Sequence, residues 1–374
     1  MPPTAYHRDM TRRILLLPHT GRPDAVDATV ATARQLQDEG LGAVLTRTDR
    51  DALADAGVEI ECGEILNEHV SLADIELGMV LGGDGTILRS AELVRHSAVP
   101  LLGVNLGHVG FLAESDRTDL AETIRQVADR AYEIEERMTI DVAVWRNGRQ
   151  VDHNWALNEA SVEKSDRARM IEVVMEVDGR PISTFGCDGV VMATPTGSTA
   201  YAFSAGGPVV WPEVDALLMV PLSAHALFAK PLVVAPTSTL AVEVLDRTDA
   251  SGVLWCDGRR ATEVPNGSRI EVTRSATPVR LARTHRAPFS ERLVRKFSLP
   301  TVGWRGPTAA HPSAERAATR AVPPPEADST EPVGAMPDSA GSDGTAPAGT
   351  GSNGTAPAGT GSNGTAPEGA EARR

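Results

Sequence analysis

The chain has few aromatic residues and a deficit of positive charge. Aromatic side chains make up only 4% of its 374 residues, which argues against a protein that stacks the bases of single-stranded nucleic acid. The formal net charge of -14 argues against binding to a nucleic acid backbone, which needs an excess of cationic side chains. We therefore expect no nucleic acid partner.

Long apolar runs and paired cysteines are also missing. No window approaches the roughly 18 consecutive apolar residues of a membrane-spanning helix, and the apolar run 14–17 is too short for the core of a signal peptide. Cys62, Cys187 and Cys256 match neither a disulfide framework nor the spacing of a zinc site. The sequence therefore predicts a cytosolic protein without a membrane partner, whose thiols are reduced and buried.

A ten-residue repeat rich in glycine, serine, threonine and proline occupies the end of the chain. The units at 341–350, 351–360 and 361–370 carry no apolar side chain larger than alanine or proline, so stacked copies would bury no core. We expect residues 305–374 to form a disordered tail, and a solenoid is the disfavoured alternative.

Up to residue 137, short apolar runs alternate with stripes of helical period. Strands that alternate with helices predict a mostly parallel sheet covered on both faces, in an α/β domain spanning residues 12–137. The strand candidates are 14–17, 41–45, 77–81 and 99–104, and the helix candidates lie within 26–36, 87–94 and 120–131.

After residue 137 apolar residues recur with a period of two, as in half-exposed strands. Hairpin turn signals stand at Asn147-Gly148, Asp178-Gly179 and Asn266-Gly267. We therefore expect a β-rich antiparallel domain over residues 138–288. A C-terminal segment, 289–304, is predicted to form a short helix that packs back onto either domain.

The most informative segment is the turn Gly82-Gly83-Asp84-Gly85, between a predicted strand and a predicted helix. Ligands bind at the carboxyl ends of parallel strands, glycines allow close approach of a phosphate, and a helix start attracts anions. The carboxylate of Asp84 would repel a bare phosphate, so it indicates a base for an attacking hydroxyl or a partner for a divalent cation. The alternative is a tight turn in which Asp84 caps the helix.

Other phosphate-binding signatures are absent. None of the three lysines, Lys164, Lys230 and Lys296, follows a glycine as a Walker loop requires. A GxGxxG motif after a strand, a DFG motif and the GxSxG nucleophile elbow are also missing. The glycine-rich turn is therefore a candidate phosphate site of a different kind.

Two polar segments in the second half are further candidates. Residues 193–201, Ala-Thr-Pro-Thr-Gly-Ser-Thr-Ala-Tyr, concentrate hydroxyl and N–H groups that suit adenine, amide and ribose, although such hydroxyls can equally satisfy their own loop. Glu159 can accept hydrogen bonds from paired ribose hydroxyls, and Asn158 can donate and accept. Exposed polar strand residues are common, so this pair alone is weak evidence.

Taken together, these motifs resemble the NAD kinase family. Its pattern combines the GGDG turn, an Asn-Glu pair and a TPTGSTAY loop followed by SAGGP, and all stand here in that order within residues 12–304. Further matches lie at 103–107, 110–112 and 256–259. A GGDG turn also occurs in lipid kinases and phosphofructokinases, so the TPTGSTAY loop is what favours the NAD kinases.

The resemblance implies transfer of the γ-phosphate of ATP, or of another nucleoside triphosphate or polyphosphate, to the 2′-hydroxyl of the adenosine ribose of NAD, giving NADP. It implies a divalent metal, usually magnesium, and assembly as a homodimer or homotetramer. Asp84 resembles the proton acceptor, Gly85 belongs to the same contact, and Arg89 is placed to meet phosphate. The other residues that it places at the dinucleotide are Asn158 and Glu159 at the ribose, and Arg169, Asp188, Thr199, Ala200, Tyr201, Ser204 and Arg259.

Two other functions fit part of the sequence pattern. A lipid kinase of the diacylglycerol or sphingosine type would share the GGDGT turn, but it would need a deep apolar pocket. A non-catalytic NAD(H) sensor would use the glycine-rich turn only to hold the pyrophosphate, and the negative charge of Asp84 argues against it.

Overall fold

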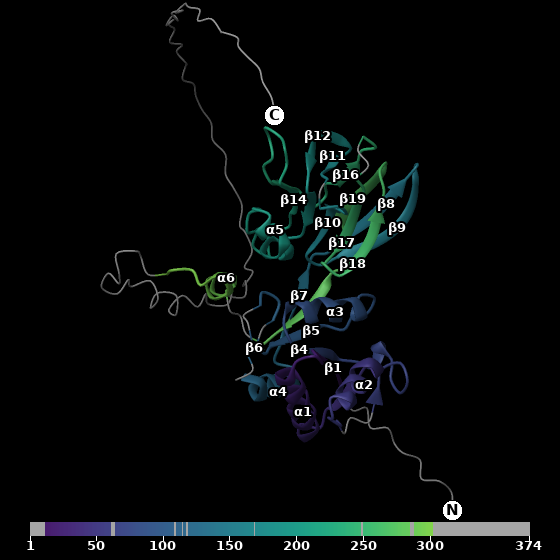
Figure 1. Cartoon of the computed structure of the whole chain (residues 1–374). Helices are drawn as coiled ribbons and strands as arrows, with labels where there is room; N and C mark the ends of the chain where they lie inside the picture. Colours follow the sequence, from purple (N-terminus) through teal and green to yellow (C-terminus); the bar gives the residue numbers. More distant parts are fainter. Residues whose placement is uncertain are drawn as a thin grey trace, which may run out of the picture. The chain divides into compact units, whose positions relative to one another are not determined.

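The computed structural model describes residues 12–60, 64–107, 110–113, 115–116, 119–167, 169–247, 250–284 and 288–301 (Figure 1). Cys62, His108 and the predicted tail, 305–374, lie outside these ranges. No helix within them is both long enough and apolar enough to cross a membrane.

An eight-stranded sheet is built mainly from the first part of the chain. Its order is β3-β2-β1-β4-β5-β20-β7, with β6 beside β5, and every pair is parallel except β20 with β7. The strands are β1 (Arg13–Pro18), β2 (Gly42–Leu45), β3 (Glu64–Ile65), β4 (Leu77–Leu81), β5 (Leu101–Asn105), β6 (Ser115–Asp116), β7 (Glu133–Arg137) and β20 (Val279–Arg283).

Helices cover both faces of this sheet, as the alternating pattern predicted. Ile14 and Leu16 pack with apolar residues of α1 and α4, whereas Leu15 and Leu17 pack with those of α3 on the opposite face. A strand buried on both faces reads as a continuous apolar run, which is what β1 shows. The helical segments here are α1 (Pro23–Asp38), α2 (Arg47–Asp55), η1 (Leu72–Asp74), α3 (Asp84–Val94) and α4 (Leu120–Ala128).

Two six-stranded antiparallel sheets make up the β-rich part. Their orders are β15-β14-β13-β10-β17-β18 and β12-β11-β16-β19-β8-β9, and side chains from both sheets share one apolar core. The strands are β8 (Ile140–Arg146), β9 (Arg149–Ala156), β10 (Glu159–Lys164), β11 (Ile171–Val177), β12 (Arg180–Cys187), β13 (Gly189–Ala193), β14 (Leu217–Leu222), β15 (Leu232–Val234), β16 (Leu240–Val244), β17 (Gly252–Cys256), β18 (Arg260–Val264) and β19 (Ser268–Arg274). Between β13 and β14 lie η3 (Thr196–Thr199) and α5 (Tyr201–Ser204).

Two of the three predicted hairpins form, and one prediction is wrong. Asn147-Gly148 joins β8 to β9 and Asp178-Gly179 joins β11 to β12, with positive φ at both residues of each turn. Asn266-Gly267 makes no hairpin, because β18 pairs with β17 while β19 pairs with β8 and β16 of the other sheet. The dipeptide signals a turn but does not determine where the next strand pairs. Asp257-Gly258, with φ of 53° and 62°, is the turn between β17 and β18.

The end of the folded chain returns to the first sheet. Residues 279–283 fall within the predicted second domain, yet they form β20, which lies between β5 and β7. After it, α6 (Phe289–Phe297) is the expected terminal helix. Phe289 lies 5.7 Å from Phe111, and Phe297 lies 4.4 Å from Phe203, measured between ring centroids. The helix therefore contacts segments of both predicted domains.

The two described cysteines behave as predicted. Cys187 and Cys256 are free and buried. Burial raises the pKa of each thiol to about 12, so both are inert thiols of the core.

Candidate functional site

The glycine-rich turn connects β4 to α3, as predicted. Gly83 is the N-cap residue of α3 and Asp84 is the first helical residue. The carboxylate of Asp84 turns toward a neighbouring segment, where Oδ2 accepts a hydrogen bond from the N–H of Phe111 at 3.0 Å and Oδ1 accepts one from Leu112 at 3.1 Å. Asp84 is therefore a held carboxylate and not the helix cap of the alternative interpretation.

Gly110 allows this arrangement. A Cβ atom at Gly110 would lie 2.3 Å from Oδ1 of Asp84, which is far inside van der Waals contact. Glycine is required here because the carboxylate occupies the space that any side chain would fill. The supporting match at 110–112 in the sequence thus corresponds to the segment that fixes Asp84.

Packing requires glycine at one position of the turn and leaves open space at two others. At Gly82 a Cβ would lie 2.5 Å from Oγ1 of Thr86, so the fold itself excludes a side chain. At Gly83 and Gly85 a Cβ would meet nothing within 4 Å, and neither residue has a positive φ. Packing does not require glycine at these two positions, and both line an open cavity. Their missing side chains leave room for a ligand against the backbone.

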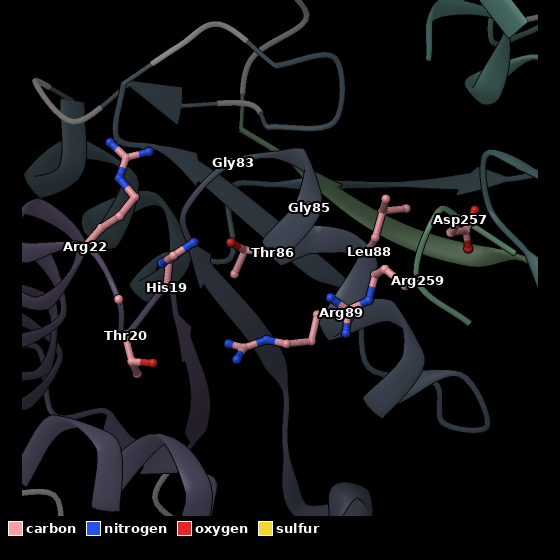
Figure 2. A pocket seen from close by; sticks show the side chains of 11 residues that line it. His19, Thr20, Arg22, Gly83, Gly85, Thr86, Leu88, Arg89, Asp257 and Arg259 are labelled. Atoms are coloured by element: carbon pink, nitrogen blue, oxygen red, sulfur yellow. The ribbon is translucent and has the colours of Figure 1, made fainter. Parts of the chain in front are cut away.

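The cavity has a volume of about 520 Å³ and is bounded by three segments (Figure 2). One is the loop 19–22 after β1, which includes His19 and Arg22. The second is the turn with the first residues of α3, including Arg89. The third is the β17–β18 turn with Asp257 and Arg259. Three arginines against one carboxylate make this wall cationic on a chain whose net charge is -14.

The arginines of the wall are held but partly exposed. Nη2 of Arg89 donates to the carbonyl of Pro18 at 2.6 Å, and Arg22 pairs with Asp24 at 2.6 Å. Nε of Arg259 lies 3.2 Å from Oε1 of Glu92. Because their side chains remain 36 to 41% exposed, these guanidinium groups can still reach an anion in the cavity.

The structure brings Gly85, Arg89 and Arg259 together, and it adds residues that sequence reasoning missed. His19 and Arg22 follow β1, the strand next to β4 in the parallel sheet. The carboxyl ends of neighbouring parallel strands open onto the same crevice. The loop that follows the first predicted strand could therefore have been expected beside the glycine-rich turn. Asp84 itself does not line the cavity, since its carboxylate points to Phe111 and Leu112.

Asp257 connects this wall to the Asn-Glu pair. Its carboxylate is only 1% exposed. It accepts hydrogen bonds from the N–H groups of Leu157 at 3.0 Å and Asn158 at 2.7 Å. Nη2 of Arg260 also lies 2.8 Å from it. The backbone that presents Asn158 is thus fixed by a buried charge.

Glu159 is a buried carboxyl group with one unused oxygen. The residue is 6% exposed, and its Oε2 has no hydrogen-bond partner among the described residues. Burial, the charge of Asp257 and a smaller contribution from Glu163 raise its pKa to about 8, against the opposing effect of a hydrogen bond from the N–H of Tyr201. A buried unsatisfied oxygen of this kind is suited to a ligand hydroxyl.

Part of the TPTGSTAY loop supports its own backbone, as the alternative interpretation proposed. Oγ1 of Thr194 accepts a hydrogen bond from the N–H of Gly197 at 3.1 Å, and Oγ1 of Thr199 donates to the carbonyl of Thr196 at 3.2 Å. Oγ1 of Thr194 also donates to the carbonyl of Leu157, outside the loop, at 2.6 Å. Gly197 packs so tightly on the backbone of Asn158 that a Cβ would lie 2.0 Å from its carbonyl oxygen. The loop is therefore locked onto the Asn-Glu pair.

The end of this loop is accessible. Thr199, Ala200 and Tyr201 are half-buried, and Ser204 is exposed at the end of α5. The Tyr201 hydroxyl bonds Glu163, and burial is the main reason that its pKa is raised. These residues can contact a ligand next to Glu159.

Asp188 and Arg169 are not brought to this cluster. Asp188 forms an ion pair with Lys164 at 2.6 Å, and the resulting hydrogen bond lowers its pKa. Lys164 is at the opposite end of β10 from Glu159, roughly 16 Å away at the usual rise per residue. Arg169 is exposed in the segment that follows β10.

Comparisons with known proteins show which family the chain resembles. Residues 15–132 match the model of the ATP-NAD kinase N-terminal domain, and residues 157–284 match that of the C-terminal domain. An NAD kinase of Leifsonia xyli is 59% identical over 296 residues, which cover 79% of this chain and 97% of that protein. An NAD kinase 2 of Streptomyces coelicolor is 58% identical over 300 residues, which cover 80% of this chain and 98% of that protein.

Solved structures show the same fold at lower sequence identity. A yeast NADH kinase complexed with NADH superposes with a TM-score of 0.69 at 20% identity, covering 78% of this chain and 89% of that one. An NAD kinase of Archaeoglobus fulgidus in complex with ATP gives a TM-score of 0.58 at 23% identity, covering 77% and 99%. The matches do not support the lipid kinase or the non-catalytic sensor. The chain belongs to the ATP-NAD kinase family.

Proposed function

We propose that the arginine-lined cavity at the glycine-rich turn holds the phosphates of the donor in an NAD kinase reaction. The reaction transfers the γ-phosphate of ATP to the 2′-hydroxyl of the adenosine ribose of NAD. The observation that carries the proposal is the cavity itself, where Arg22, Arg89 and Arg259 meet the open backbone at Gly83 and Gly85. Phosphoryl transfer depends mainly on positioning and on neutralisation of charge, and this wall supplies both.

Asp84 is proposed to accept the proton of the attacking hydroxyl. Each of its oxygens accepts one backbone N–H, and a carboxylate offers about four acceptor sites in total. One site on each oxygen therefore remains for the ribose hydroxyl. The two hydrogen bonds from backbone N–H groups fix the orientation of the carboxylate. A general base needs such a fixed orientation.

Asn158 and Glu159 are proposed to bind the ribose, and Thr199, Ala200, Tyr201 and Ser204 the rest of the dinucleotide. The unused Oε2 of Glu159 is the strongest support, because it is buried and has no partner in the described part of the protein. The accessible end of the loop lies next to Glu159, because the N–H of Tyr201 donates a hydrogen bond to the carboxyl group of Glu159.

Asp188 and Arg169 are proposed to serve the site of a neighbouring copy. Asp188 pairs with Lys164 at the opposite end of β10 from Glu159, and Arg169 lies in the segment after this strand. These positions support the assignment, which requires a homodimer or homotetramer. We further propose a cytoplasmic location, in keeping with the free, buried thiols of Cys187 and Cys256.

Magnesium is proposed to arrive with the phosphates of the donor. Among the described residues no cluster of three or more carboxylate, histidine or cysteine side chains could hold a metal. The residues fit this mode of binding, because Mg²⁺ commonly takes its ligands from substrate phosphates, water and one or two carboxylates, and Asp84 is the carboxylate at the turn. When bound, the ion supplies neutralisation of phosphate charge.

The direct test is an assay of NADP formation on the full chain with ATP, other nucleoside triphosphates and inorganic polyphosphate as donors. We expect NADP from NAD with at least one donor, and no phosphorylation of an NAD analogue that lacks the 2′-hydroxyl. A lipid diol supplied with the same donors is the negative control. No NADP with any donor, or phosphate transfer to the 2′-deoxy analogue, would contradict the proposed reaction.

The pKa of Glu159 predicts a pH dependence of NAD binding. With a pKa of about 8 the free carboxyl is protonated at neutral pH, whereas a ribose hydroxyl donates to its ionised form. NAD must therefore displace a proton. As the pH rises toward 8, the dissociation constant for NAD should fall by up to about tenfold per pH unit. In Glu159→Gln we expect weaker binding that no longer changes with pH in this window.

Calorimetry between pH 6 and 9 measures this effect, and Glu172→Gln, at a half-buried carboxylate of β11, is the control that should keep it. An equal slope in the wild type and in Glu159→Gln would rule out the ribose assignment.

The raised pKa of Glu159 also affects folding, because the folded state keeps a proton that the unfolded state loses above its ordinary pKa of 4.5. Its contribution to stability therefore decreases as the pH rises from about 4.5 to about 8 and then levels off.

A further inference from the structure

A second cavity lies away from the donor cavity, with a volume of about 430 Å³. It is bounded by β7, the end of β20, the start of α6 and the segment at Pro212 and Glu213. Its charged lining consists of three arginines and three glutamates, and Phe289 adds apolar surface. The charged residues are Arg137, Arg283, Arg292, Glu133, Glu135 and Glu213. The proposed NAD kinase reaction uses none of these residues.

Arg137 is the most unusual of them. The residue is 4% exposed, and its Nε has no hydrogen-bond partner among the described residues. Its ion pair with Glu135, at 2.8 Å, is shared, because Glu135 also lies 2.6 Å from Arg283. Burial and the nearby charges of Arg283 and Arg292 lower the pKa of Arg137 to about 10. A buried guanidinium beside two others is stabilised by a further anion.

The cavity also has an apolar wall of fixed shape. Phe289, at the first position of α6, lies 5.1 Å from the ring of Trp211 and 5.7 Å from that of Phe111. A cavity lined by guanidinium groups and an aromatic ring suits a small organic anion that has both a charged and an apolar end.

Two of the cavity's arginines contact the segment that holds Asp84. Nη1 of Arg292 donates to the carbonyl of Phe111 at 3.3 Å, and Nη1 of Arg283 donates to that of Leu112 at 3.1 Å. The Phe111 carbonyl and the Leu112 N–H belong to one peptide group, and that N–H donates to Asp84 at 3.1 Å. A single peptide unit therefore connects Arg292 to the carboxylate of Asp84.

We propose that this cavity binds a small carboxylate or phosphate monoester through Arg137 and Arg292, and that binding slows phosphoryl transfer by drawing Arg292 away from the Phe111 carbonyl. The effect on turnover rests on the proposed function of Asp84, whereas the binding does not. Loss of the hydrogen bond from Arg292 makes the peptide group between Phe111 and Leu112 less polarised. This weakens the hydrogen bond that the N–H of Leu112 donates to Asp84. Coupling between the sites then takes the form of a lower kcat.

The probe is benzoate, with neutral benzamide as its isostere and phenyl phosphate as the dianionic counterpart. On the full chain, calorimetry should give a dissociation constant for benzoate of about 1 mM or lower, and at least about tenfold weaker binding of benzamide. Comparison with phenyl phosphate shows which oxyanion the cavity prefers. Saturating benzoate should lower kcat for NADP formation by about fivefold.

Variants locate the effect. Arg292→Gln, and independently Arg137→Lys, should weaken benzoate binding at least about tenfold, whereas Glu213→Gln, which removes a negative charge from the cavity wall, should strengthen it. Arg22→Gln, in the donor cavity, should leave benzoate affinity unchanged. Equal affinity in the wild type, Arg292→Gln and Arg137→Lys would overturn the site, and so would loss of binding in Arg22→Gln. Binding without any change in kcat would overturn the coupling, and absence of all NADP formation would instead count against the proposed reaction.

Discussion

Asp84→Asn is expected to lower kcat for NADP formation by about 10²- to 10⁴-fold while the dissociation constant for NAD changes only a few-fold. The amide has almost the same shape as the carboxylate, but it cannot accept a proton from the ribose hydroxyl at neutral pH. It also places an NH₂ group against one of the two backbone N–H donors, from Phe111 or Leu112. Steady-state kinetics and calorimetric titration with NAD measure the two effects separately.

Asp38→Asn is the matched control, because Asp38 is exposed at the end of α1. It should retain full turnover. Thermal unfolding of Asp84→Asn checks that the loss of one hydrogen bond has not unfolded the protein. Turnover in Asp84→Asn comparable to that of the wild type would end the general-base assignment.

Asp257→Asn should have the largest effect on stability, a loss of about 2 to 5 kcal/mol in the free energy of unfolding. The carboxylate is 1% exposed and accepts from Leu157 and Asn158 while it neutralises Arg260. An amide there turns one acceptor into a donor and removes the shorter of two ion pairs of Arg260, which keeps only its pair with Glu92 at 3.3 Å among the described residues. Denaturant unfolding measures the loss, and a raised KM for NAD should accompany it because Asn158 moves.

Asp152→Asn provides the comparison for this second prediction. Asp152 is half-buried and accepts a hydrogen bond from Oγ1 of Thr262 at 2.6 Å. Its replacement should cost less than about 1 kcal/mol. An equal loss of stability in both variants would show that the buried charge of Asp257 has no special role.

Much of the fold could be predicted from the sequence, because each half has one dominant periodicity. Strands such as β4 and helices such as α1 follow from patterns within a single segment. The position of β20 does not, since a five-residue strand that mixes apolar residues with arginines contains no information on which sheet it joins. The same limit explains Asn266-Gly267, where the turn forms but the following strand belongs to the other sheet.

The residues of the candidate site also fall into two groups, those predictable from a local segment and those that only the folded chain brings together. Asp84 and Gly85 were identified because a glycine-rich turn between a strand and a helix carries its own chemical meaning. Arg22 was missed because its place in the cavity depends on the pairing of β1 with β4. The anchoring of Asn158 by Asp257 joins residues about a hundred positions apart, and only the folded chain shows it.

The position of β20 bears on how the protein is synthesised. A ribosome that has released residues up to β7 has made every strand of the first sheet except the one that separates β5 from β7. Until the whole antiparallel part has emerged, the edge of β5 that pairs with β20 is open, and β7 lacks β20, the strand with which it pairs. The nascent α/β half therefore matures only after the last strand arrives, so a premature stop anywhere before residue 279 leaves this half without β20, even where every strand of the antiparallel part has been made.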